Sequence, residues 1–94
     1  MSVDEGLLEQ VAVMVEEKVR REIYSKLPRG AVLDLSTVAY VDRDEEGKLL
    51  VNVDVELRAH PGLNVDVDEL VNEAVEEALK EADKVLRERG LKPE

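Results

Sequence analysis

Two groups of acidic residues are spaced so that they could bind a cation. The run Asp42-Arg43-Asp44-Glu45-Glu46-Gly47 has the alternating carboxylates and the glycine with which a calcium-binding loop begins. The position where such a loop needs a bidentate glutamate is Val53, so a solvated hairpin turn is the favoured interpretation. Asp66, Asp68 and Glu69 could also hold a hard cation, but they suit the first turn of a helix, and we expect a helix cap.

Catalytic groups are sparse. His60 is the only histidine, there is no cysteine to share a metal with it, and its neighbours Pro61-Gly62 favour an exposed loop. Asp34, Asp54 and Glu56 could do acid and base chemistry, yet such alternation is typical of a solvated strand face. Glycine-rich phosphate loops and nucleophile elbows are missing. We expect no enzyme activity, no cofactor and no metal. The alternative is a small-ligand or divalent-cation-binding protein that uses the acidic loop residues, and an enzyme using His60 with a strand carboxylate is a remote third hypothesis.

The composition limits the partners. The chain has 94 residues, of which 44% are hydrophobic and 38% are charged, and we expect one domain over residues 1–94. With no Trp or Phe the core is thin, which makes a second subunit a source of further burial. A net charge of −10 opposes direct contact with nucleic acid or an anionic membrane. The acidic start without an apolar signal core and the short apolar runs predict a cytoplasmic protein. The abundant Glu, Lys and Arg and the lack of cysteine are typical of proteins from hot environments.

Apolar residues recur at spacings of three and four along the first third of the chain, which is the period of an amphipathic helix. Ser2 and Glu5 have the spacing of a capping box, so the helix should begin there, and Pro28 should end it. We expect exposed pairs of opposite charge four residues apart, such as Glu16 with Arg20. The stripe that should face the core consists of Leu8, Val11, Val15, Val19, Ile23 and Leu27.

Residues 31–58 form two runs of alternating apolar and polar residues joined by an acidic turn, which predicts one long β-hairpin. Placing Asp42 opposite Lys48 brings the strong apolar positions of both strands to one face. The same register sets Asp34 opposite Glu56, a like-charge pair that should be mildly destabilising. The expected inner face consists of Leu33, Leu35, Thr37, Ala39 and Val41 in the first strand and Leu49, Val51, Val53, Val55 and Leu57 in the second.

A second helix should begin after Asp66, which can cap it together with Glu69 three residues later. It should end at Gly90, before Leu91 and Pro93. Its inner side includes alanines at four-residue spacing, which allow close approach to another element. The order helix, strand, strand, helix predicts an α+β domain in which two helices pack on one face of an antiparallel β-hairpin. We expect dimerisation to extend the sheet.

The predicted outer face of the hairpin contains a small apolar cluster. Its members are Val32, Val38, Tyr40 and Leu50, with Tyr40 opposite Leu50 in the expected register, and they are the candidate interface residues. Scattered surface apolar residues are an equally good interpretation. The strand edges favour contact more strongly, because neither strand contains proline and only Lys48 offers the usual lysine protection. We expect a homodimer or a heteromeric protein partner, formed through the edges or the outer face.

Three segments carry a resemblance to a small archaeal family of unknown function. They are Ile23-Tyr24, the strand Val51-Asn52-Val53-Asp54-Val55-Glu56-Leu57, and Val65-Asp66-Val67-Asp68-Glu69-Leu70-Val71-Asn72-Glu73-Ala74. Genes of that family often lie near the gene for the prefoldin beta subunit, and the family offers no catalytic residues to transfer. The order of elements is also similar to the small dimerisation subunit of the KEOPS tRNA-modification complex, which has an additional first strand. That resemblance implies an accessory subunit.

Overall fold

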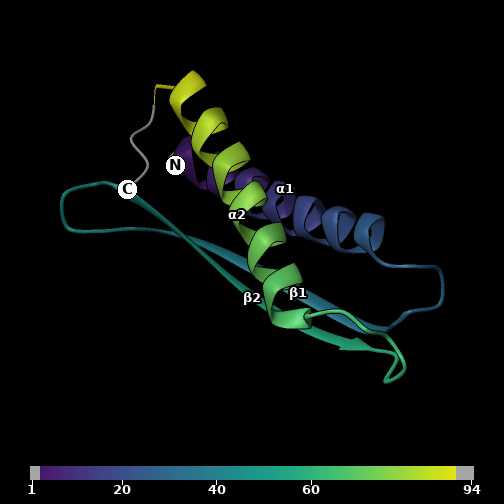
Figure 1. The fold of residues 1–94 in the computed structure, drawn as a ribbon. Coiled ribbons are helices and arrows are strands. Elements are labelled where there is room, and N and C mark those ends of the chain that lie inside the picture. The colour runs from purple at the N-terminus through teal and green to yellow at the C-terminus, as the bar shows by residue number, and fades with distance from the viewer. Residues whose placement is uncertain (1–2, 91–94) are drawn as a thin grey trace.

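Two helices cover one face of a two-stranded antiparallel sheet (Figure 1). The computed structural model describes residues 3–90, with the elements α1 (Val3–Lys26), β1 (Val32–Arg43), β2 (Leu49–Ala59) and α2 (Val67–Glu88). The predicted α+β class and element order are confirmed. The capping box expected at Ser2 and Glu5 lies outside the residues whose side chains are described, as do Leu91 and Pro93. The predicted stop at Gly90 is confirmed, since α2 ends at Glu88 and Gly90 has a φ of 76°. Neither helix in the described range is long and apolar enough to cross a membrane.

The two helices run antiparallel, and their apolar stripes belong to one core. Ion pairs join them, with 3.1 Å from Lys26 Nζ to Glu73 Oε2 and 3.6 Å from Lys18 Nζ to Glu81 Oε2. Four-residue spacing puts each stripe on one side of its helix, and the small alanines of α2 allow the helices to approach closely. The buried residues are Val11, Val15, Val19 and Ile23 in α1 and Leu70, Ala74, Ala78, Ala82 and Leu86 in α2.

Local hydrogen bonds mark the end of α1 and the start of α2 at the places that the sequence predicts. After α1, the Ala31 amide donates to the Pro28 carbonyl over 3.1 Å, because proline cannot continue the helix. Before α2, Asp66 accepts a hydrogen bond from the Glu69 amide at 3.1 Å, which satisfies one of the unpaired donors of the first turn. The expected cap at Asp66 is therefore confirmed.

The register of the hairpin differs from the prediction by two residues. Asp44 Oδ1 accepts hydrogen bonds from the amides of Glu46 and Lys48, both at 2.9 Å, and Gly47 has a φ of 83°. These contacts close a tighter turn than one that pairs Asp42 with Lys48. Because a shift of two residues preserves the alternation of faces, the inner and outer sets change little. The shift also puts Asp34 opposite Arg58, so the like-charge pair predicted with Glu56 does not form.

A bulge at the start of β1 overturns one predicted face. The ladder shifts between Val32 and Asp34, so one extra residue stands in β1 and the alternation of side chains changes there. Val32, expected on the outer face, packs against the core instead. Leu33, expected on the inner face, is 51% exposed. The prediction of their faces was wrong because a bulge leaves no mark in the apolar pattern.

Candidate interaction surface

The acidic groups serve the local backbone. Asp44 is the acceptor of the hairpin turn, and Asp66 is the cap of α2. Within residues 3–90, no three side chains of the His, Cys, Asp or Glu types come together in a way that could hold a metal ion. The arrangement therefore gives the two acidic loops a structural role.

His60 organises its own loop. Its Nδ1 accepts a hydrogen bond from the Gly62 amide at 3.1 Å, and its backbone amide donates to the Ala31 carbonyl at 2.8 Å. A Cβ atom at residue 62 would lie 3.3 Å from Nδ1, so glycine suits this tight loop. The Nδ1 atom of His60 therefore helps to fix the conformation of the loop.

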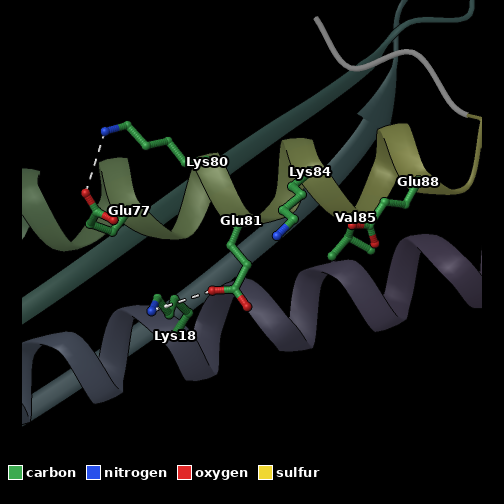
Figure 2. A pocket seen from close by; sticks show the side chains of 7 residues that line it. All are labelled: Lys18, Glu77, Lys80, Glu81, Lys84, Val85 and Glu88. Atoms are coloured by element: carbon green, nitrogen blue, oxygen red, sulfur yellow. Dashed lines mark ion pairs between the residues drawn. The ribbon is translucent and has the colours of Figure 1, made fainter.

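A groove between the two helices carries charges of both signs (Figure 2). Lys18 lies 3.6 Å from Glu81, and Lys80 lies 3.6 Å from Glu77. The hydrogen bond with Glu22 raises the pKa of Lys18 above its ordinary value, and attraction to Glu22 and Glu81 acts in the same direction. Three lysines and three glutamates line the groove, so it has no excess of positive charge with which to bind an anion.

The outer face of the sheet has no helix over it (Figure 1). Tyr40 is 52% exposed and Val38 is 37% exposed on this face, and Leu50 is half-buried. In the observed register Tyr40 pairs with Asn52, and not with Leu50 as expected, so the two apolar side chains are diagonal neighbours. With Val32 packed against the core, the predicted outer cluster reduces to Val38, Tyr40 and Leu50.

The backbone of β2 presents its odd-numbered residues away from β1. In an antiparallel pair, residues alternate between those that bond to the partner strand and those whose N–H and C=O point to the open edge. The Asp44 amide donates to the Lys48 carbonyl, so the even-numbered residues near the turn are the bonded ones. From Leu49 to Leu57, the odd-numbered residues of β2 therefore face outward along the edge.

The edge of β1 has the same geometry but is partly capped. Of the two strands, helix α1 packs mainly against β1. The Glu16 carboxylate accepts a hydrogen bond from the outward-facing amide of Ala39 at 3.1 Å. The carboxylate thus takes up the backbone N–H that an added strand would need as a hydrogen-bond donor. The pair of Glu16 with Arg20 that the sequence predicts is replaced by this contact, and Lys18 pairs with Glu22 at 3.1 Å instead.

The edge of β2 has no such cap among the described residues. No side chain or loop within residues 3–90 hydrogen-bonds to the outward groups of Leu49, Val51, Val53, Val55 or Leu57. Proline is absent from β2, and its single cationic side chain is Arg58, near the end. The two edges of the hairpin therefore differ: β1 has a carboxylate cap at Ala39, whereas β2 has no cap within the described residues and is the more open edge.

The side chains beside this edge are incompletely covered. Val51, Val53 and Val55 point to the helical side of the sheet but are only half-buried, whereas Ala39 on β1 is 8% exposed. The difference arises because α2 packs against α1 more than it packs against β2. An apolar strip therefore runs along the same edge that has the available backbone groups.

The comparisons with known proteins agree with this architecture. The model of the DUF3194 family, described as proteins of unknown function, matches residues 2–85. The chain belongs to the DUF3194 family. No curated protein matches it.

Two solved archaeal structures resemble this DUF3194 member. A crystal structure from Thermococcus onnurineus NA1 has a TM-score of 0.78 at 28% identity, over 95% of this chain and 84% of the other. The solution structure of the hypothetical protein mth677 from Methanothermobacter thermautotrophicus has a TM-score of 0.76 at 20% identity, over 93% and 92% of the two chains. The second likeness shows the fold alone. Family and fold are thus established for this DUF3194 member, and no activity comes with them.

Proposed function

We propose that the chain is a non-enzymatic protein-interaction module that binds its partner by strand addition at the edge of β2. One observation carries the proposal: the odd-numbered residues from Leu49 to Leu57 direct their backbone groups outward with no partner in the described chain, whereas Glu16 caps β1. Strand addition supplies main-chain hydrogen bonds to such groups, and side chains beside the edge supply specificity.

Two further features support the proposal. The half-buried valines of β2 would lose solvent contact when another strand lies beside them, which adds apolar burial to the hydrogen bonds. The acidic surface keeps nucleic acid away and leaves protein as the fitting class of partner. An accessory subunit of a larger assembly, such as KEOPS, would be one case of this function.

A proline at Val53 tests the mode of binding. The Val53 amide points outward, so Val53→Pro removes an edge donor and leaves the bonds between β1 and β2 in place. Val41→Pro is the matched control, because it makes the same change on the other edge. Unfolding in urea should show that both variants fold.

To measure binding, the chain is immobilised and incubated with an extract of the source cells, and the retained proteins are identified by mass spectrometry. We expect the unsubstituted chain and Val41→Pro to retain the same protein, and Val53→Pro to lose it. Identical retention by all three chains would show that the β2 edge is not the binding element.

A further inference from the structure

We propose that the strand that occupies the β2 edge is β2 of a second copy of this chain, paired antiparallel about a two-fold axis at Asn52. This inference rests on the proposed function and specifies its partner. The result is a four-stranded sheet in the order β1, β2, β2, β1.

The geometry of the edge permits this self-pairing. Two identical strands that pair antiparallel about a two-fold axis normal to the sheet place the same faces on the same side. With the axis at Asn52, Val51 lies opposite Val53 of the second copy, and Leu49 lies opposite Val55. All four positions are odd-numbered, so the outward backbone groups of both copies meet and form about eight hydrogen bonds.

The same pairing buries the apolar strip. The residues of the two β2 strands that become neighbours on the helical side are aliphatic, and Val51, Val53 and Val55 are half-buried in the single chain. Cross-strand pairs of β-branched residues stabilise a sheet, and the helices of both copies lie on this side. The second copy therefore supplies the cover that α2 does not provide.

The charges on the outer face select the register. With the axis at Asn52, Lys48 lies opposite Glu56 of the second copy, once on each side of the axis. Asn52 meets its own copy, and an amide can donate and accept in the same pair. An axis at Val53 would set Lys48 opposite Arg58.

Axes further along the strand in either direction are also disfavoured. An axis at Asp54 would set this carboxylate opposite itself. An axis at Val51 would pair Lys48 with Asp54 but would set Glu46, in the turn, opposite Glu56, whereas the axis at Asn52 sets Glu46 opposite Arg58. Asn52 is the centre that pairs opposite charges and avoids like ones.

The capped edge of β1 limits the assembly to two chains. After β2 pairs with β2, the exposed edges of the larger sheet are both β1. Glu16 occupies the Ala39 amide on each of them, which hinders the addition of a further strand. The proposal is therefore a closed dimer.

Single cysteines test the register, because the chain has none of its own. Residues that face each other at a non-hydrogen-bonded position have Cα atoms about 4.5 Å apart, which a disulfide can bridge. We expect Asn52→Cys to form a covalent dimer under mild oxidation. Leu50→Cys and Asp54→Cys, on the same face of the same strand, are the controls and should remain largely monomeric on a non-reducing gel.

A charge reversal provides a second measurement that needs no cross-link. Lys48→Glu and Glu56→Lys should each weaken dimerisation by about 2- to 30-fold, since each removes two exposed ion pairs. The double variant Lys48→Glu with Glu56→Lys should recover the original dissociation constant. Sedimentation velocity over a range of concentrations gives these constants, and failure of the double variant to recover would overturn the register.

The possible failures can be told apart. Cross-linking of Asp54→Cys in place of Asn52→Cys would overturn the register and retain the dimer. If the chain is a monomer at high micromolar concentration, the proposed dimer is wrong. Strand addition would still be supported if the immobilised chain retains a different protein from the extract and the Val53→Pro variant does not retain it. A dimer that Val53→Pro leaves unchanged would contradict use of the edge itself.

Discussion

The contact between Glu16 and the β1 edge leads to a quantitative prediction. Glu16→Ala removes the acceptor that lies 3.1 Å from the Ala39 amide. Ala39 is 8% exposed with the carboxylate in place, and its amide loses this charged acceptor at the sheet edge when the carboxylate is removed. A hydrogen bond to a charged group contributes about 1.5 to 3 kcal/mol. Glu16 is half-buried, and alanine gains a few tenths of a kcal/mol in helix propensity, so we expect a net loss of about 1 to 1.5 kcal/mol.

Urea unfolding followed by circular dichroism measures this loss. In a domain of this size, 1 kcal/mol corresponds to about 4 to 8 °C in Tm, so Glu16→Ala should also melt about 4 to 12 °C lower. Glu16→Gln keeps an oxygen acceptor and should lose about half as much. Because association contributes to apparent stability, all variants are compared at one protein concentration.

The matched control is Glu17→Ala. Glu17 is exposed on the same helix and makes no hydrogen bond or ion pair within the described residues, so its removal should change stability by less than about 0.5 kcal/mol. Equal effects of Glu16→Ala and Glu17→Ala would refute the assignment of Glu16 as an edge cap. Light scattering adds a second readout, since an uncapped β1 edge should promote association beyond the state of the unsubstituted chain.

Two further substitutions test the core. The Thr37 hydroxyl is buried without a hydrogen-bond partner in the described structure, so Thr37→Val should raise the free energy of unfolding by about 1 kcal/mol. Thr37→Ser, which keeps the hydroxyl, should not, and a loss of stability in the valine variant would mean that the hydroxyl is satisfied. Ala78 is fully buried, and Ala78→Leu should destabilise the fold by about 1 to 3 kcal/mol in urea unfolding. Lys80→Leu, on the exposed side of α2, is its control, and an equal effect would contradict tight packing at Ala78.

Periodicity predicts the elements of this chain well. The four-residue spacing of Val11, Val15, Val19 and Ile23 defines a helical face that is buried in the structure. Alternation likewise separates the inner from the outer residues of β2. Both signals work because a buried face leaves a repeated mark along the sequence.

Local features that periodicity does not reveal set the register of the hairpin and the faces of the first residues of β1. The Asp44 side chain selects a tight turn, which moves the register by two residues and leaves every face unchanged. The bulge exchanges the positions of Val32 and Leu33 and affects only the first two residues of β1. Neither event alters the apolar pattern enough to be read from it.

The difference between the two sheet edges also escapes the sequence. Glu16 stands among charged residues on a helix, where an ion pair with Arg20 is the simple expectation. Its bond to Ala39 depends on how α1 lies along β1, a contact between segments 23 positions apart. The apolar residues of the outer face, Val38, Tyr40 and Leu50, can be identified from the alternation of apolar and polar residues in the sequence. The choice of β2 over β1 requires the tertiary structure.

The antiparallel pairing of the two helices has a consequence for synthesis of the chain. Lys26 and Glu73 are 47 positions apart, and Lys18 and Glu81 are further apart still. The helix that covers the apolar stripe of α1 therefore leaves the ribosome after α1, β1 and β2. A hairpin can form early from local contacts, but the core closes only when α2 is complete. The core of this domain thus closes only after the hairpin has emerged, and the net charge of −10 opposes association of chains that are still incomplete.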